Sequence, residues 1–320
     1  MVNCSPEASG ALCPHEKTPP QRIAVIYNPV GGSANMVTLT ELIDRLRQSR
    51  AVVDLHPTGP ERSSATNLAK KALDTGADLL IAFGGDGTAA QVGAAVAGSR
   101  VRLGVYQGGT SNVFANAFYP PMSGLQFADM VLHGRAQPVD IICYKYMLED
   151  SAELQEGIVL CGLCIGPYAE AISMAPRVFK RLFGPATYAW RVALASLDLV
   201  QHRYKFVTPE RTWSSIANIG VILNVTHSAL LGLSRGCCAS DGLLDLVTYR
   251  MDNIWQIFKT LFWLIVSRPH RSPHYSRCRT SEVTISSSRP FALNIDGETG
   301  GPTRSIALTV VPGALNLIAS

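Results

Sequence analysis

Long apolar runs are missing from this chain of 320 residues. The nearest is LFWLIV at 261–266, bounded by Lys259 and Arg268, whereas a membrane-spanning helix needs about 18 apolar residues. Residues 1–21 have no basic region followed by an apolar stretch, so no signal peptide is expected. Their Pro, Ser and small polar content predicts a disordered tail. The sequence therefore predicts a soluble, cytoplasmic protein.

A strong charge of either sign is also missing. The chain has 28 basic and 24 acidic residues, a formal charge of +4, and no block of Lys and Arg. This balance excludes a dedicated nucleic-acid binder, so no nucleic-acid partner is expected. The apolar fraction of 47% favours a globular protein with substantial cores.

Cysteine is too scarce for a disulfide scaffold, with eight residues spread over the chain. Cys161 and Cys164 form a C-x-x-C pattern inside the apolar run GIVLCGLCIG. This run is predicted to be a strand, in which residues three apart point to opposite faces, so the two thiols cannot share a zinc ion. The pattern favours two buried core residues over a metal or redox site.

The chain changes its rhythm near residue 140. From 22 to 140, short apolar runs at 23–27, 52–55, 79–83 and 101–105 alternate with amphipathic stretches, which predicts a doubly wound α/β domain with a parallel sheet. From 141 to 320 the pattern predicts a β-rich domain, an antiparallel sandwich or barrel. Its strands are expected near 157–165, 216–225, 243–249, 281–287, 291–295 and 304–310, and its helices near 176–200 and 252–267.

Three predicted strands of the first domain run into glycine-rich turns. These turns are NPVGG at 28–32, GGDGT at 84–88 and GGTSN at 108–112. Ligands in open parallel sheets bind at the carboxyl ends of strands, so the three turns are expected to meet at one crevice. Glycine lets backbone N–H groups approach phosphate oxygens, and a following helix adds its positive end. Together the turns suit a nucleoside triphosphate, although neither a Walker A nor a G-x-G-x-x-G motif is present.

Asp86 is the most informative residue of these turns. A carboxylate inside a phosphate-binding loop repels the ligand unless a Mg²⁺ ion lies between them. The alternative is an N-cap for the helix that starts near Thr88, and both roles are compatible.

GGDGT followed by G-T-x-N resembles the ATP-binding domain of the diacylglycerol kinase and sphingosine kinase family. Two motifs of the second domain extend the resemblance: SDGLLD at 240–245 is similar to the family's D-G-x-L-D turn, and NIDGE at 294–298 is similar to its D-G-E motif. The likeness covers nearly the whole chain from Arg22 and is nearest to the bacterial soluble lipid kinases of this group. It implies an ATP- and Mg²⁺-dependent lipid kinase whose partners are ATP and a lipid at a membrane surface.

The resemblance also implies roles for individual residues. Glu298 would be the general base on the lipid hydroxyl, although sphingosine kinases assign that role to the aspartate that is here Asp86. Asp86 and Asp140 would lie near the catalytic Mg²⁺. A structural Mg²⁺ would bind Asp241 and the backbone carbonyls of Cys238 and Leu243. The residues expected to line the ATP site are Asn28, Pro29, Val30, Gly31, Gly32, Thr58, Gly85, Asp86, Gly87, Thr88, Ala89, Ala90, Gln91 and Thr110.

Four positions depart from the family pattern. Gln91 replaces a glutamate, Gln107 a proline, and both Val113 and Ser240 an aspartate. They leave open altered substrate choice or weak activity.

Competing interpretations remain. A catalytically silent relative that binds nucleotide or lipid and regulates a partner is the main alternative, but it has no need to keep Asp86, Asp140 and Glu298 together. GLSRG at 232–236 fits the serine-hydrolase pattern G-x-S-x-G, but no helix is expected straight after it. An NAD kinase shares the GGDG loop but fits the later motifs less well.

Aromatic residues beside basic ones mark the predicted helix at 252–267. Trp255, Phe258, Phe262 and Trp263 accompany Lys259, a pattern that fits either peripheral contact with an anionic membrane or packing onto the β-rich domain. Neither the acceptor lipid nor the oligomeric state can be read from the sequence, and a homodimer stays open.

Overall fold

The computed structural model divides the chain into two compact units, and both fold classes expected from the sequence are confirmed. Unit 1 comprises Met1–Ile141 and Val311–Ser320, and unit 2 comprises Ile142–Val310. The residues that the structure describes are 19–29, 33–61, 63–109, 111–151, 153–173, 201–225, 237–265 and 268–319. Most of the expected tail at 1–21, the expected helix at 176–200 and the GLSRG pattern lie outside these residues.

The units correct the expected boundary in one respect. The sequence pattern predicts a second domain from 141 to 320, but residues after Val310 belong to unit 1. The reason is the long last strand, whose end pairs with a strand of the first sheet: Asn316 and Leu317 lie beside Arg102 and Leu103. The apolar run at 314–318 (ALNLI) is therefore core of unit 1.

Unit 1 is built on a parallel sheet with the strand order β2-β1-β3-β4, to which the end of β14 is added next to β4. Its first four strands are β1 (Arg22–Tyr27), β2 (Val52–Pro57), β3 (Leu79–Gly84) and β4 (Arg102–Gln107). All four runs expected from the sequence are thus strands. All six residues of β3 are buried, as a central strand covered on both faces requires, whereas the edge strand β2 is only half-buried.

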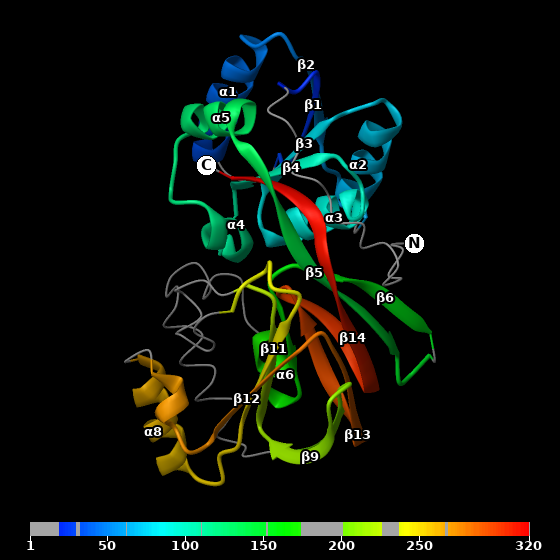
Figure 1. The fold of residues 1–320 in the computed structure, drawn as a ribbon, viewed down its shortest axis with the longest axis vertical. Helices are drawn as coiled ribbons and strands as arrows, with labels where there is room; N and C mark the ends of the chain where they lie inside the picture. Colours follow the sequence, from blue (N-terminus) through cyan, green and yellow to red (C-terminus); the bar gives the residue numbers. More distant parts are fainter. Residues whose placement is uncertain are drawn as a thin grey trace. The chain divides into compact units, whose positions relative to one another are not determined.

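Helices cover both faces of this sheet. Helices α1 and α5 pack together on one side of the strands, and α2 and α3 pack together on the other (Figure 1). The helices of unit 1 are α1 (Ser33–Arg47), α2 (Ser64–Asp74), α3 (Asp86–Val96), α4 (Val113–Phe118) and α5 (Gly124–His133). The apolar stripe of α1, with Leu39, Leu42 and Leu46, is buried, as an amphipathic helix on a sheet requires.

Unit 2 is an antiparallel β structure with the strand order β12-β11-β10-β7-β13-β14. Strands β8 and β9 extend it from β13, and β6 pairs with β5. The strands are β5 (Arg135–Met147), β6 (Leu154–Val159), β7 (Gly162–Ile165), β8 (His202–Val207), β9 (Thr212–Ala217), β10 (Ile219–Leu223), β11 (Leu244–Tyr249), β12 (Tyr275–Thr280), β13 (Glu282–Ile295) and β14 (Glu298–Ala319). Between them lie α6 (Pro167–Ser173), α8 (Ile254–Ile265) and the short 3₁₀ helix η3 (Pro269–Arg271).

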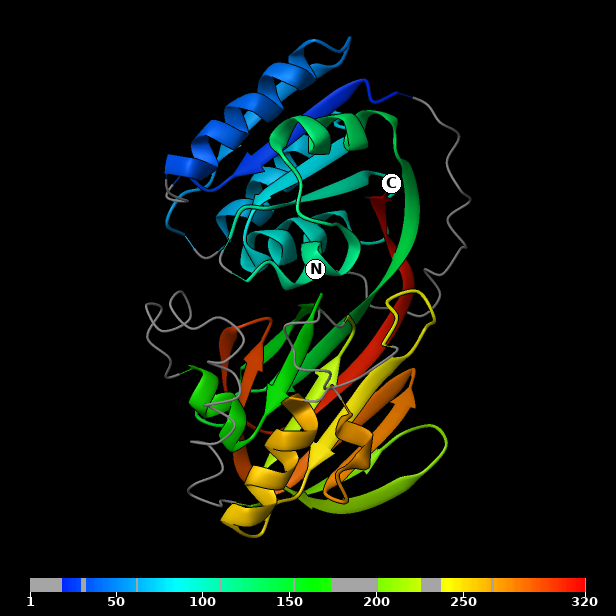
Figure 2. The ribbon, with the colours of Figure 1, turned by 90° about the vertical axis from the view of Figure 1, so that its left-hand side faces the viewer.

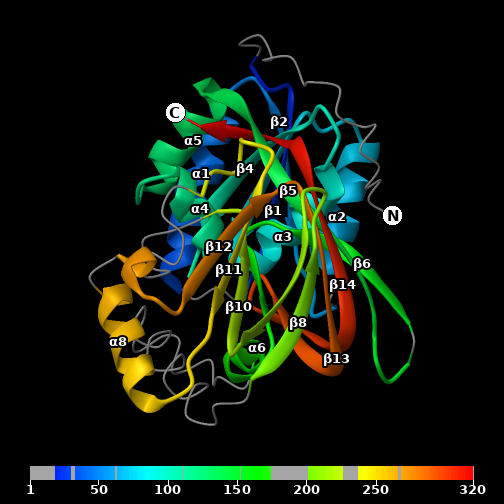
Figure 3. The ribbon, with the colours of Figure 1, turned by 60° about the horizontal axis from the view of Figure 1, so that its bottom comes forward.

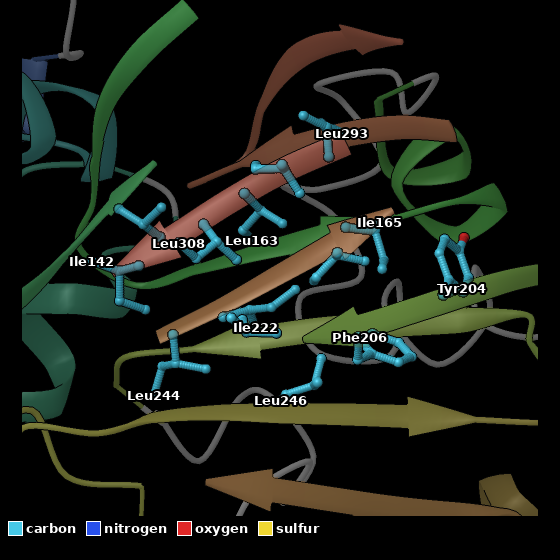
Figure 4. Packing of buried hydrophobic residues seen from close by; sticks show 14 of the residues in the cluster. Ile142, Leu163, Ile165, Tyr204, Phe206, Ile222, Leu244, Leu246, Leu293 and Leu308 are labelled. Carbon is cyan, nitrogen blue, oxygen red and sulfur yellow. The ribbon is translucent and has the colours of Figure 1, made fainter. Parts of the chain in front are cut away.

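The core of unit 2 lies on one face of these strands (Figure 4). Leu163, Ile165, Ile222, Leu244 and Leu246 belong to it, together with aromatic rings from β8. Alternate residues of β10 and β11, including Val221 and Val247, form a second cluster on the opposite face. Both faces of β10 and β11 are therefore buried, because successive strand residues point to opposite sides.

Two strand predictions in unit 2 need correction. The run at 157–165 is broken between β6 and β7, where Cys161 lies in a bend. The opposite-faces argument for Cys161 and Cys164 therefore does not apply. Both side chains are nonetheless largely shielded, and burial raises the pKa of the Cys164 thiol to about 12. The runs at 281–287 and 291–295 form one strand, β13, whose register with β14 shifts between Ser286 and Phe291.

Candidate active site

The glycine turns after β3 and β4 are in direct backbone contact. The Gly108 N–H donates to the Gly84 carbonyl at 3.0 Å. A Cβ added at Gly109 would lie 2.4 Å from the Gly85 Cα, a distance no side chain tolerates. Glycine is thus required here by close approach, and two strand-end loops present their backbones side by side.

The ends of β1 and β2 lie beside these turns. The Asn28 N–H donates to the Phe83 carbonyl at 3.3 Å, and the Thr58 N–H donates to the Tyr27 carbonyl at 2.8 Å. Asn28 and Pro29 are exposed, while Thr58 is half-buried. The carboxyl ends of all four parallel strands therefore lie at one edge of the sheet, as expected. Four residues expected here, Val30, Gly31, Gly32 and Thr110, lie outside the described residues.

Asp86 begins α3 and links it to α4. Its Oδ1 accepts a hydrogen bond from the Phe114 N–H at 3.0 Å, in the first turn of α4. The side chain is half-buried, as are Gly85, Gly87 and Thr88. The expected N-cap role is not observed, because the capping position is Gly85 and Asp86 lies inside the first turn. A carboxylate held in this way is a hard oxygen donor, which is the ligand type that Mg²⁺ prefers.

Asn112 shapes the turn after β4, a role that the sequence analysis did not assign. Its side chain makes two hydrogen bonds with the Gly109 backbone, accepting from the N–H at 2.7 Å and donating to the carbonyl at 2.8 Å. Its own backbone is left-handed, with φ of 46°. Asparagine tolerates that region better than most residues, which is the physical signal in the G-T-x-N motif.

Gln91 and Ala89 take part in the packing of α3. The Gln91 Oε1 accepts from the Ala65 N–H at 3.1 Å, in the first turn of α2, so this side chain ties α3 to α2. Ala89 is buried, so its methyl group packs into the core. Ala90 is half-buried. Of these three residues expected to line the nucleotide site, Gln91 and Ala89 are thus engaged in helix packing.

Asp140 is a buried residue of β5. Its Oδ1 accepts from the Gly313 N–H of β14 at 2.8 Å. Gly313 has φ of +59°, so the strand bends where the carboxylate meets it. Asp140 and Gly313 both belong to unit 1, so this bond joins the parts of β5 and β14 that lie in that unit.

The D-G-E motif in unit 2 forms a tight hairpin between β13 and β14. Asp296 and Gly297 both have positive φ, of 48° and 91°, as a two-residue type I′ turn requires. The Asp296 carboxylate accepts three backbone N–H groups: Leu160 at 2.8 Å, Cys161 at 2.8 Å and Gly162 at 2.9 Å. The first carboxylate of this motif thus organises the bend between β6 and β7, a role that was not expected.

Glu298 is exposed at the start of β14. Burial is the main cause that raises the pKa of the Tyr144 phenol to about 12, and the charges of Tyr146, Asp296 and Glu298 raise it further. Tyr144 therefore lies close enough to Glu298 to interact with its charge. The ring of Tyr144 covers Gly157 on the neighbouring strand, where an added Cβ would lie 2.6 Å from the Tyr144 oxygen. Glu298 is therefore accompanied by a phenol that remains protonated at neutral pH.

Asp241, which was expected to bind a structural Mg²⁺, already has a positive partner in the chain. Asp241 directs Oδ2 at the Arg279 guanidinium and accepts the Leu243 N–H on Oδ1 at 3.0 Å. The Cys238 thiol faces the Ser240 hydroxyl at 3.1 Å. The positive partner of Asp241 is thus an arginine of the chain itself.

The neighbouring Asp245 is almost fully buried and pairs with Arg277, whose pKa is raised by this hydrogen bond. Within the described ranges, no group of three or more His, Cys, Asp or Glu side chains is arranged to hold a metal ion. No helix among the described residues is long and apolar enough to cross a membrane.

Comparison with known proteins places this arrangement in context. Residues 22–144 match the family model described as the diacylglycerol kinase catalytic domain. The chain is 27% identical to a diacylglycerol kinase of Bacillus subtilis (strain 168), over 88% of this chain and 91% of that protein. It is 26% identical to a lipid kinase described as YegS-like from Xanthomonas euvesicatoria pv. vesicatoria (strain 85-10), over 93% of this chain and 96% of that one.

Solved structures share the two-domain fold. A crystal structure of a protein assigned as a diacylglycerol kinase from Bacillus anthracis str. Sterne has a TM-score of 0.78 at 18% identity, covering 95% of this chain and 97% of that chain. Yeast NADH kinase complexed with NADH has a TM-score of 0.57 at 12% identity, covering 95% and 84%. The resemblance expected from GGDGT and the later motifs is confirmed, and the relatives that match over most of this chain are named as diacylglycerol or lipid kinases.

Proposed function

We propose that this chain, which carries a catalytic domain of the diacylglycerol kinase family, transfers the γ-phosphate of ATP to the hydroxyl group of a lipid. The observation that carries the proposal is the backbone contact between the glycine turns after β3 and β4. Such turns expose N–H groups to phosphate oxygens, and α3 adds the positive end of its dipole.

Phosphoryl transfer depends mainly on positioning and on neutralising charge. Asp86 is held by the Phe114 N–H and lies within the turn that would receive the phosphates. It would hold Mg²⁺ there, and the ion would supply charge neutralisation on the phosphate oxygens. Asn112 keeps the turn after β4 in shape through its two bonds to Gly109.

Glu298 is the proposed general base on the acceptor hydroxyl. It is exposed, and the I′ turn anchored by Asp296 fixes its backbone. A positioned carboxylate that accepts a proton in the transition state contributes about 10²–10⁴-fold to a rate. Asp86 is the alternative base, and the variants below separate the two.

The acceptor would be a lipid with a primary hydroxyl, such as diacylglycerol, a sphingoid base, ceramide or phosphatidylglycerol. Such a substrate places the protein at the cytoplasmic face of a membrane, as a peripheral protein. A silent relative that binds nucleotide or lipid is the competing proposal, motivated by Gln91, Gln107 and Val113. Gln91 and Gln107 instead have packing roles, since the Gln107 amide donates to the Tyr119 carbonyl at 3.2 Å.

The test is phosphate transfer from labelled ATP to a panel of these lipids in mixed micelles, with and without Mg²⁺. Asp86→Asn is expected to lower kcat by about 100-fold or more. Glu298→Gln is expected to do the same if Glu298 is the base. The matched control is Asp129→Asn, an exposed carboxylate of α5 that pairs with Arg45, and it is expected to keep wild-type activity. ATP binding without transfer to any lipid would favour the silent relative, and no ATP binding would reject both.

A further inference from the structure

Helix α8 presents large aromatic side chains to solvent. Trp255, Phe258 and Phe262 are 77%, 58% and 56% exposed. At about 100° per residue these three positions and Lys259 fall within one arc of roughly 100° on the helix surface. Figures 2 and 3 show α8, in gold, along the outside of unit 2 beside the strands. The outward face is therefore a compact apolar stripe with one basic residue.

The opposite side of α8 holds the helix in place. Thr260 is buried, and its hydroxyl lies 3.3 Å from that of Ser272. The Arg268 N–H donates to the Trp263 carbonyl at 2.8 Å, and the Arg271 guanidinium lies 5.8 Å from the centre of the Trp263 ring. These contacts fix which residues face outward, so the exposed stripe is a property of the packed helix.

The segment that contains α8 is rich in cations. From 253 to 281 the sequence contains Lys259, Arg268, Arg271, Arg277 and Arg279, and no aspartate or glutamate. Arg277 and Arg279 face Asp245 and Asp241, whereas Lys259, Arg268 and Arg271 are exposed. Before α8, the exposed Asp252 is paired with Arg250, so the exposed cations Lys259, Arg268 and Arg271 leave the segment with a net positive charge along and after the helix.

We propose that α8 is a membrane-docking helix that inserts Trp255, Phe258 and Phe262 into the interface of an anionic lipid surface. Exposed aromatic residues combined with Lys and Arg are the composition of helices that lie in a membrane interface. The cations add attraction to anionic headgroups. A second copy of this chain fits less well, because a symmetric contact would bring the same cationic patch against itself.

This surface goes beyond the proposed function, which identifies a reaction and not the element that reaches the bilayer. The docking proposal rests on the proposed function only in that docking would give the enzyme access to a lipid substrate. The two can therefore fail separately, since vesicle binding needs neither ATP nor catalysis.

The experiment is sedimentation of the full chain with vesicles of phosphatidylcholine alone, or of equal parts phosphatidylcholine and phosphatidylglycerol. The wild type is expected to bind the anionic vesicles about tenfold or more tightly. A triple variant with Trp255→Ser, Phe258→Ser and Phe262→Ser is expected to lose about tenfold or more of that binding. Lys259→Glu is expected to weaken the preference for phosphatidylglycerol. The matched control is Leu154→Ser on β6, a residue 56% exposed in the same unit, and it is expected to bind as the wild type does.

Unchanged vesicle binding by the triple variant, or no binding by the wild type, overturns the proposal. Sedimentation velocity that shows a dimer lost in the triple variant identifies the stripe as a contact between copies, which also overturns it. A dispersed short-chain diacylglycerol separates the two proposals. Equal transfer by the wild type and the triple variant supports docking as a separate step. Absence of transfer by both, with vesicle binding intact in the wild type, rejects the kinase and leaves the docking helix standing.

Discussion

Two glycines account for the closeness of the strand-end loops in unit 1. A Cβ on Gly109 would lie 2.4 Å from the Gly85 Cα, and Asn112 holds Gly109 through both of its amide atoms. No other residue type leaves room for this approach. The backbone N–H groups proposed to bind phosphate therefore depend on the absence of a Cβ at Gly109.

Gly109→Ala is expected to weaken nucleotide binding by about tenfold or more, because its Cβ would push the two turns apart. The measurement is ATP affinity by titration calorimetry. The control is Gly76→Ala, which has φ of +83° and open space around it. That variant is expected to cost roughly 1 kcal/mol of stability from backbone strain and to leave ATP affinity unchanged. Equal ATP affinities in Gly109→Ala and wild type would contradict the phosphate-binding role.

Asp296 and Glu298 differ in role although they share one motif. Asp296→Ala would leave three backbone N–H groups without their acceptor, and it is expected to lower the free energy of unfolding by about 3 kcal/mol or more. Glu298→Gln is expected to change the unfolding free energy by less than about 0.5 kcal/mol, since the side chain is exposed. Urea unfolding of both variants gives the comparison. Equal losses of stability in the two variants would contradict the assignment of a structural role to Asp296 and of a catalytic role to Glu298.

At the scale of elements, the parallel strands of unit 1 were predictable because burial on both faces produces continuous apolar runs, as in β1 and β3. Strands β8 and β12 were not predicted. Their sequences, HRYKFV and YSRCRT, bury only alternate or isolated residues and carry several cations. β8 is in the sheet because it pairs with β13, and β12 because it pairs with β11. Such pairing between distant segments cannot be predicted from the local sequence.

The candidate site divides in the same way. The GGDGT motif predicted the strand-end turn, because the glycine and aspartate residues can be recognised directly in the sequence. The roles of Asp296 and Arg279 could not be predicted from the sequence, because each depends on a distant residue of the chain. Asp296 accepts a hydrogen bond from Cys161, and Arg279 pairs with Asp241. Long-range partners of this kind are supplied by the fold, and a motif shows only one member of each pair.

The segment 237–243, which leads into β11, should be independent of divalent metal. Arg279 already faces the Asp241 carboxylate, so removal of metal with EDTA is expected to leave the unfolding midpoint of the nucleotide-free protein unchanged. Arg279→Ala is expected to lower stability by about 1 kcal/mol or less, as for a partly exposed ion pair. Differential scanning calorimetry with EDTA and with Mg²⁺ tests this directly. A higher midpoint in Mg²⁺ for the wild type that is lost in Asp241→Asn would contradict this prediction and assign a metal ion to Asp241.

At the scale of the whole molecule, both units bury tyrosines. Burial raises the pKa of Tyr119 in unit 1 and of Tyr144, Tyr204 and Tyr249 in unit 2. Above a pH of about 10 the unfolded chain loses phenolic protons that the folded chain keeps, so unfolding releases protons. Stability is therefore expected to be unaffected by these groups below pH 10 and to fall as the pH rises above it.

Urea unfolding across this range checks the sign. For Tyr144 the loss belongs between its unfolded pKa near 10 and its folded pKa of about 12. Tyr144→Phe is expected to reduce the steepness of the decline in that interval. An identical decline in the variant would show that this phenol does not contribute.

The most direct test of the central claim is mass spectrometry of a total lipid extract incubated with the protein, ATP and Mg²⁺, with no acceptor chosen in advance. We expect one class of hydroxyl-bearing lipid in the extract to gain the mass of one phosphate group. That product should carry the label when the γ-phosphate of ATP is labelled, and it should be absent with Asp86→Asn. ATP binding by the wild type with no phosphorylated lipid would contradict the claim and leave a nucleotide-binding protein without transfer activity.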